Sequence, residues 1–249
     1  MRIDTQVLNV LSNCTTDGRF LKLPGQLERS LYTKTNKVLE AAGGTWNRKA
    51  AAHVFDQDAA DAMDIIILTG EVASLKSKAQ IFNYFPSTPP IAKSVIVKAR
   101  IEAGMEVLEP SAGRGALAFP AADCGAIVDC VELMDTNYAL LQGDARLRDV
   151  RQADFLNMAP EQRYDRIVMN PPFEKQADIH HVLHALEFLK PGGSLVSVMA
   201  AGVTFRDNRL TQDFRDLIRS RGGDIEANPE GAFKASGTMV NTVIVTIPN

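Results

Sequence analysis

The sequence is poor in cysteine and contains no apolar run long enough to cross a membrane. Its three cysteines, Cys14, Cys124 and Cys130, are too few and too scattered for a disulfide framework or a zinc site. The first residues, Met1–Asp4, lack the apolar core of a signal peptide. We therefore expect a soluble cytoplasmic protein with reduced cysteines and no membrane segment.

The chain as a whole also lacks an excess of positive charge. Its net charge is −3 and its isoelectric point is about 5.8, which by itself does not indicate a nucleic-acid-binding protein. Within residues 19–49, however, seven basic residues accompany only two acidic ones. Arg48 and Lys49 lie in this segment, and we expect them either to contact phosphates or to form solvated surface. The single tryptophan, Trp46, is expected to pack within the same region.

The 249 residues, of which 45% are hydrophobic, suffice for one main domain and a small appendage. From about Met105 onward, strand-like and helix-like patterns alternate, which predicts an α/β domain with a mostly parallel sheet. A Gly/Pro-rich loop over 228–238 joins the last two strands, so they are expected to pair as a hairpin that makes the final strand antiparallel. Lys190-Pro191-Gly192-Gly193 is expected to stop a helix and turn the chain into a strand. The expected strands are 105–109, 127–133, 150–155, 166–169, 194–199, 224–227 and 241–247, with helices over 175–189 and 211–221.

The N-terminal part has a different character. Residues 26–42 are expected to form a helix that ends at Gly43-Gly44, residues 45–55 a hairpin, and residues 58–68 a second helix. We expect a small basic α+β appendage over residues 1–80, and a main domain over residues 81–249.

The most informative segment is Asn170-Pro171-Pro172-Phe173, which follows the apolar run 166–169. A β-branched run followed by two prolines indicates a buried strand that ends abruptly in a stiff corner. The side-chain carbonyl of Asn170 and the backbone carbonyl of Pro171 can accept the two protons of an amino group, while Phe173 offers a stacking surface. A nucleobase amino group fits such a site. The alternative is an ordinary strand that ends in a Pro-Pro turn.

A second cluster follows the expected strand 105–109. Gly113 and Gly115 allow a tight turn and close approach of a ligand to the backbone, although a purely structural turn is the alternative. Glu132, at the end of the next strand, is placed to accept hydrogen bonds from ribose hydroxyls. Asp154, which precedes Phe155, is placed to accept one from an adenine amino group, or else to cap a helix or turn.

These segments together resemble class I S-adenosylmethionine-dependent methyltransferases over roughly residues 84–249. The aromatic-x-x-Thr-Pro element at residues 85–89, placed before the glycine loop, resembles the gamma-type DNA adenine-N6 methyltransferases. The resemblance implies a Rossmann-like seven-stranded sheet, mostly parallel with an antiparallel last strand. It also implies S-adenosylmethionine as the cofactor and DNA as the partner.

The resemblance assigns roles to residues as follows. The expected cofactor-binding residues are Phe85, Thr88, Pro89, Glu109, Pro110, Ser111, Ala112, Gly113, Gly115, Glu132, Asp154, Phe155 and Asn170. The expected catalytic residues are Asn170, Pro171, Pro172 and Phe173, and the expected nucleic-acid contacts are Arg48, Lys49 and Lys175. The target base would be flipped out of its duplex and stacked on Phe173.

Other functions stay open at this point. An RNA methyltransferase that acts on adenine N6 or guanine N2 is the first alternative, followed by a protein-glutamine methyltransferase and a non-catalytic binding protein. His180, His181 and His184 lack the glutamate of the helical zinc motif, so we expect no metal. Because the sequence ends at Asn249 without a large recognition domain, we expect a short or relaxed target sequence.

Overall fold

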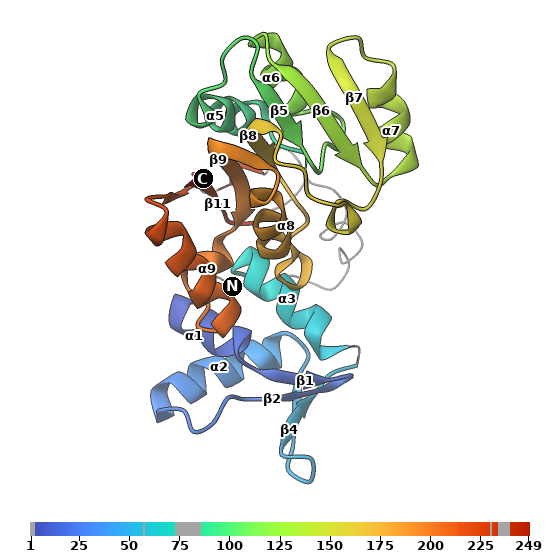
Figure 1. Ribbon diagram of the computed structural model, residues 1–249. Coiled ribbons are helices and arrows are strands. Elements are labelled where there is room, and N and C mark those ends of the chain that lie inside the picture. The colour runs from blue at the N-terminus through green and yellow to red at the C-terminus, as the bar shows by residue number, and fades with distance from the viewer. Residues whose placement is uncertain (1–2, 57, 73–85, 230, 234–239) are drawn as a thin grey trace. The chain divides into compact units, whose positions relative to one another are not determined.

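The computed structural model describes residues 3–56, 58–72, 86–229, 231–233 and 240–249 (Figure 1). It divides into two compact units, Met1–Asn83 with Ala201–Asp213, and Tyr84–Ala200 with Phe214–Asn249. We call them the N-terminal unit and the sheet unit. The predicted boundary between residues 80 and 81 lies outside the described residues and stays a prediction. The return of residues 201–213 to the N-terminal unit was not anticipated.

The sheet unit is built on seven strands in the order β10-β11-β9-β8-β5-β6-β7. β5 to β9 pair in parallel, while β11 pairs antiparallel with both β9 and β10. This confirms the expected Rossmann-like sheet and its antiparallel last strand. The strands are β5 (Glu106–Glu109), β6 (Ile127–Glu132), β7 (Leu147–Gln152), β8 (Tyr164–Met169), β9 (Leu189–Ala200), β10 (Asp224–Ala227) and β11 (Thr242–Pro248).

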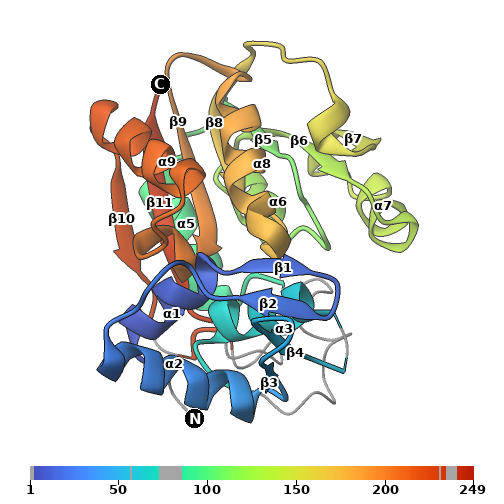
Figure 2. The same ribbon diagram turned by 90° about the horizontal axis from the view of Figure 1, so that it is seen from below.

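Helices cover both faces of this sheet. α5 and α6 lie on one face and α8 on the opposite face (Figure 2). The central strands are therefore buried on both sides, which explains why residues 167–169 of β8 and all but Ser197 of residues 195–200 of β9 are apolar. The helices are α5 (Pro89–Ala99), α6 (Ala118–Asp123), α7 (Asp135–Gln142), α8 (Ala177–Leu186) and α9 (Arg209–Ser220), of which α9 crosses from the N-terminal unit into the sheet unit.

Two local predictions for the sheet unit were wrong. The segment 190–193 is part of β9 rather than a turn before it, because Leu189 already pairs with Tyr164 and Ser194 pairs with Arg166. The proline and glycines are absorbed as an irregularity in the ladder, with Gly192 at φ 78°. β7 ends at Gln152, before the predicted end at residue 155.

At the first residues of β5, β8 and β9, charged side chains tie the strands together. The Glu106 carboxylate accepts hydrogen bonds from Arg148 (2.6 Å), Lys190 (3.0 Å) and Arg163 (3.2 Å). These bonds lower the pKa of Glu106 to about 2, and the bond from Arg148 has the largest effect. Lys190 also reaches both carboxylate oxygens of Asp165, at 3.1 Å each.

The N-terminal unit contains a four-stranded antiparallel sheet in the order β1-β2-β4-β3. Its strands are β1 (Thr15–Asp17), β2 (Phe20–Lys22), β3 (Thr45–Asn47) and β4 (Ala52–Val54), and its helices are α1 (Thr5–Ser12), α2 (Arg29–Ala41) and α3 (Ala59–Thr69). The second hairpin, α2 and α3 confirm the expected elements. α1 and the first hairpin were missed, because they are short.

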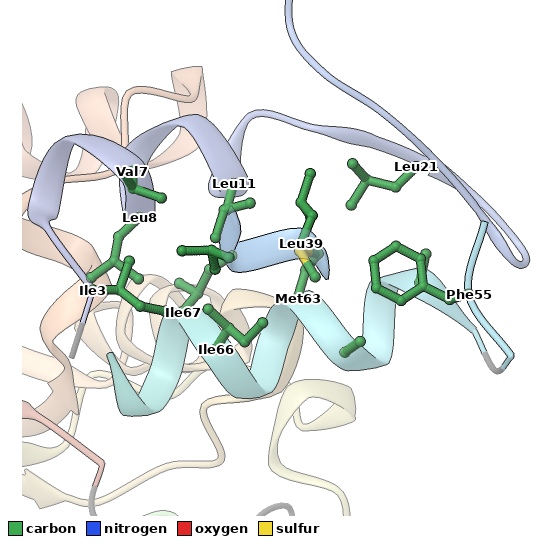
Figure 3. Close-up of a cluster of buried hydrophobic side chains, with 13 residues drawn as sticks. Ile3, Val7, Leu8, Leu11, Leu21, Leu39, Phe55, Met63, Ile66 and Ile67 are labelled. Carbon is green, nitrogen blue, oxygen red and sulfur yellow. The ribbon is translucent and has the colours of Figure 1, made fainter. Parts of the chain in front are cut away.

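The core of the N-terminal unit gathers apolar side chains from α1, α2, α3 and β2 (Figure 3). Leu21 and Leu39 are fully buried in it, and Phe205, from the returning segment, packs against it. Asn9 of α1 also donates a hydrogen bond to Asp207. The unit is therefore completed by residues distant in the sequence.

Candidate active site

Asn170 lies immediately after β8, at the carboxyl end of the parallel strands, where α/β sheets bind their ligands. Its side-chain Nδ2 donates to the Oγ of Ser87 at 3.2 Å. Pro171 is buried and Pro172 is exposed. The Phe173 ring is only 7% exposed, so most of its surface is covered in this structure.

The segment that follows Phe173 has a strained backbone. Lys175 and Gln176 both adopt left-handed conformations, at φ 49° and φ 62°. This conformation is costly for residues with a Cβ atom, and two in succession require support from the surroundings. The strain explains why α8 begins at Ala177 rather than at the predicted Lys175. The exposed Lys175 side chain lies 3.7 Å from Glu174.

The glycine loop connects β5 to α6. Gly113 (φ 55°) and Gly115 (φ 82°) both occupy conformations that favour glycine. A Cβ atom on Gly115 would lie 2.5 Å from the Phe119 ring, so this position excludes larger residues. Ala112 N donates to Val131 O at 3.0 Å and thereby fixes the loop to β6. Within the loop Pro110 is buried and Ser111 is half-buried.

Glu132, the last residue of β6, is held against this loop. One carboxylate oxygen accepts from Gly113 N at 2.6 Å and the other from Met134 N at 2.7 Å. Each carboxylate oxygen has a further lone pair, so Glu132 can still accept hydrogen bonds from a ligand. The residue is 7% exposed and therefore largely shielded from water.

Glu109, the last residue of β5, is 2% exposed, and its Oε2 has no hydrogen-bond partner among the residues that the structure describes. Desolvation raises the pKa of this carboxyl well above its ordinary value, and the nearby charge of Glu132 raises it further. A buried acceptor without a partner costs free energy, which a cationic or hydrogen-bond-donating ligand would recover.

Asp154 and Phe155 form a turn rather than a strand end. Asp154 is exposed and caps the short helix Phe155–Asn157, where it accepts from Leu156 N at 3.1 Å. This is the capping role that the sequence left open. Phe155 is 3% exposed and contacts His184 and Phe188, with ring centroids 4.9 and 5.1 Å away.

Other predicted site residues are placed as follows. Phe85 lies outside the described residues. Thr88 is buried and its Oγ1 donates to Ala232 O at 3.1 Å, while Pro89 is exposed at the start of α5. Arg48 and Lys49 are exposed at the turn between β3 and β4 in the N-terminal unit.

Sequence reasoning missed two kinds of residue. Leu133 and Met134 directly follow Glu132 and are 65% and 51% exposed, an unusual pair of open apolar side chains beside a buried carboxylate. Their position after a strand-end acid was the available signal. Ser87 was also missed, because only folding brings it to Asn170.

The helix that carries three histidines uses two of them structurally. His181 Nδ1 lies 2.9 Å from Ala177 O, and His184 Nε2 lies 3.1 Å from Met158 O. Among the described residues, no group of three or more histidine, cysteine, aspartate or glutamate side chains could hold a metal ion. No helix in the described ranges has both the length and the apolar character that a bilayer span requires.

Comparison with solved structures identifies the same fold. A modification subunit of a putative type I restriction enzyme from Vibrio vulnificus matches with a TM-score of 0.57 at 15% identity, over 97% of this chain and 60% of that chain. A putative class I S-adenosylmethionine-dependent methyltransferase from Listeria monocytogenes matches with a TM-score of 0.54 at 15% identity, over 76% and 67% of the two chains. A putative RNA methyltransferase from Pyrococcus horikoshii matches with a TM-score of 0.51 at 19% identity, over 75% and 97%.

No curated protein matches the sequence. A family model, the methyltransferase small domain, matches residues 91–220, which is more than half of the chain. With the fold, this match confirms S-adenosylmethionine as the expected cofactor. The protein therefore belongs to the methyltransferase small domain family and is a class I S-adenosylmethionine-dependent methyltransferase.

Proposed function

We propose that this enzyme methylates the N6 amine of adenine in DNA. The observation that carries the proposal is the position of Asn170-Pro171-Pro172-Phe173, directly after β8. β8 is the parallel neighbour of β5, which ends at Glu109, and β6 ends at Glu132 on the other side of β5. The amine-binding residues and the cofactor-binding residues therefore follow adjacent strands at one edge of the sheet.

We assign the cofactor contacts to residues of this edge. Oε2 of Glu109, for which the described ranges contain no partner, fits the cofactor's ammonium group, and the remaining lone pairs of Glu132 fit ribose hydroxyls. Leu133 and Met134 offer apolar surface to the adenine ring. When bound, the cofactor would supply an electrophilic methyl group on its sulfonium. Activation of the amine and stacking of the base are assigned to residues of the protein.

The chain's own residues prepare the nucleophile. Adenine N6 is a poor nucleophile because its lone pair is delocalised into the ring. When the Asn170 side-chain carbonyl and the Pro171 backbone carbonyl accept hydrogen bonds from its two N–H groups, the nitrogen can become pyramidal and localise that lone pair. Alignment and electrostatics then provide most of the rate acceleration, so no general base is needed before attack. After methyl transfer the nitrogen carries a positive charge, which it loses by releasing one proton to water.

The target base must leave its duplex to reach this site. We assign its stacking surface to Phe173. Because this ring is 7% exposed, stacking requires the segment 173–176 to rearrange, and the two left-handed residues Lys175 and Gln176 make it a strained segment. The exposed Lys175 is assigned to a phosphate.

DNA is favoured as the substrate by the order of the motifs along the chain and by the exposed cations Arg48 and Lys49. The neighbour from Vibrio vulnificus, a modification subunit of a putative type I restriction enzyme, is similar over nearly the whole chain. RNA is the alternative, favoured by the neighbour from Pyrococcus horikoshii, a putative RNA methyltransferase. We propose a short or relaxed target sequence.

The test measures methyl transfer from isotopically labelled S-adenosylmethionine to duplex DNA, single-stranded DNA, RNA and protein. N6-methyladenine in DNA, detected by mass spectrometry, is the expected product. Asn170→Ala should lower the turnover number by roughly 100-fold or more, by analogy with the loss of one transition-state hydrogen bond, and leave cofactor affinity nearly unchanged. Asn249→Ala, in the same unit, is the control. Near wild-type turnover in Asn170→Ala, or transfer only to RNA or protein, would contradict the proposal.

DNA contact by the hairpin is tested separately. Each neutralised phosphate adds close to one unit to the salt dependence of log affinity. Replacing Arg48 and Lys49 with alanine should flatten this slope by about two units, to a similar degree on unrelated sequences. Lys93→Ala, which removes an exposed cation of the sheet unit, is the control. An unchanged slope in the double variant would assign the hairpin tip to solvated surface.

A further inference from the structure

In the described part of the chain, the hydroxyl group of Ser87 accepts a hydrogen bond from the side-chain amide of Asn170. The two residues are 83 positions apart, and their contact joins the segment before α5 to the end of β8 (Nδ2–Oγ distance 3.2 Å). Ser87 is 8% exposed, so water competes little for its hydroxyl group. Its neighbours Phe85, Thr88 and Pro89 were assigned to the cofactor, whereas Ser87 itself had no role.

The backbone around Ser87 is stiff. Pro86 precedes it, and Pro89 and Pro90 follow after Thr88. Proline fixes its own φ and restricts the residue before it, and Thr88 is accordingly extended at φ −68°, ψ 155°. The bond from Thr88 Oγ1 to Ala232 O, at 3.1 Å, anchors the segment further. A hydroxyl group on such a backbone loses little entropy when it holds a partner.

The contact restrains the Asn170 side chain, with Nδ2 as the donor and the hydroxyl group of Ser87 as the acceptor. The side-chain amide is planar, with a donor edge at Nδ2 and an acceptor edge at Oδ1. While Nδ2 donates to Ser87, the carbonyl oxygen is presented on the opposite edge. Rotation of the amide by half a turn would present N–H groups to the substrate amine, and two donors cannot form a hydrogen bond. The chemistry proposed above therefore depends on this orientation.

We propose that Ser87 is a positioning residue that holds the Asn170 side chain where its carbonyl group accepts a hydrogen bond from the substrate amine. This inference rests on the proposed amine methylation. Ser87 acts through Asn170 and does not touch the reacting atoms. It should therefore affect the rate of methyl transfer rather than the binding of cofactor or nucleic acid.

The test compares Ser87→Ala, Ser87→Thr and the control Ser220→Ala, which removes an exposed hydroxyl group of α9. Turnover and KM are measured with labelled S-adenosylmethionine and unmethylated duplex DNA of mixed sequence, and cofactor Kd by calorimetry. Ser87→Ala should lower kcat about 10-fold or more, the scale of a small misalignment of a catalytic group, with KM and Kd within about twofold of wild type. Ser87→Thr retains the hydroxyl group and should recover most of the rate.

The outcomes separate the two proposals. If Asn170→Ala is inactive and Ser87→Ala has wild-type kcat, the positioning role is wrong and the amine-activation proposal stands. If Asn170→Ala keeps its turnover, the proposed function itself fails. A parallel loss of Tm, Kd and kcat in Ser87→Ala would indicate a merely structural role and overturn the inference. If Ser87→Thr does not fold, the kcat, KM and Kd of Ser87→Ala alone decide.

Discussion

The two ends of β5 carry glutamates only three residues apart, in opposite environments. Glu106, at the first position, is held by Arg148, Lys190 and Arg163, and its pKa falls to about 2. Glu109, at the last position, is buried, one of its oxygens has no partner in the described part of the chain, and its pKa is raised. At the first position the carboxylate joins neighbouring strands, whereas at the last position the carboxyl group has hydrogen-bonding capacity that a ligand could use.

The two ends of the sheet therefore differ in how their charged side chains are paired. Ion pairs at the first residues of β5, β8 and β9 are satisfied within the protein. At the carboxyl ends, groups that a ligand could satisfy are buried at a cost in free energy. Such a cost is expected where binding, rather than folding, supplies the compensating interactions. Substitutions at the two ends should therefore have opposite consequences.

The largest effect is expected at Glu132, at the end of the sheet where we propose that the cofactor binds. Glu132→Ala removes the acceptor for Gly113 N and Met134 N and the proposed ribose contact. S-adenosylmethionine binding should weaken by roughly 1–3 kcal/mol, the cost of leaving buried polar groups unpaired. Calorimetry measures it, with the exposed Glu102→Ala as the control. Unchanged affinity would place the cofactor elsewhere.

The next effect concerns Glu109 and its pH dependence. A cation binds the ionised carboxylate better than the acid, so affinity for S-adenosylmethionine should rise as pH increases through the raised pKa of Glu109. Glu109→Gln should lower affinity and remove this dependence, as calorimetry over a pH series would show. A wild-type pH profile in the variant would exclude Glu109 from cofactor binding.

The same residue should have the opposite effect on stability without ligand. Because the folded-state pKa of Glu109 is raised, its stabilising contribution is complete below its unfolded value of about 4.5 and is lost as pH rises through the folded pKa. At neutral pH, Glu109→Gln should therefore be at least as stable as the wild type. Chemical denaturation without cofactor measures this, and a clear destabilisation would contradict it.

The smallest effect is expected at Glu106, where the change in stability has the opposite sign to that at Glu109. Its folded-state pKa is lowered to about 2, so its stabilisation is present above the ordinary value and is lost as pH falls toward 2. Glu106→Gln should cost about 1 kcal/mol of unfolding free energy at neutral pH, a typical net value for a hydrogen-bonded group. The variant and the wild type should converge in acid, while cofactor affinity is unchanged. If Glu106→Gln lost as much cofactor affinity as Glu109→Gln, the two ends of β5 would not differ in their role in cofactor binding.

Much of this architecture could be predicted from local patterns. The apolar runs predicted the strands of the main sheet. The helix predicted over residues 58–68 is α3, which Asp58 caps at its start and Gly70 at its end. The segment 190–193 was predicted wrongly because proline and glycine signal a turn by their local preferences. Pairing with β8 instead retains them within β9. The missed α1 is eight residues long, and so short a helix is stabilised mainly by packing.

By itself, the sequence determined the order of the seven strands of the sheet unit and the position of Glu132 and Asn170 at or directly after strand ends, because these follow from periodicity and turn chemistry over a few residues. Only the tertiary structure decided which of these groups are buried, and which partners they have. The unpartnered oxygen of Glu109, the return of residues 201–213 and the bond between Ser87 and Asn170 all depend on contacts between distant segments. Burial and hydrogen bonding across such distances are set by packing, which local sequence patterns do not encode.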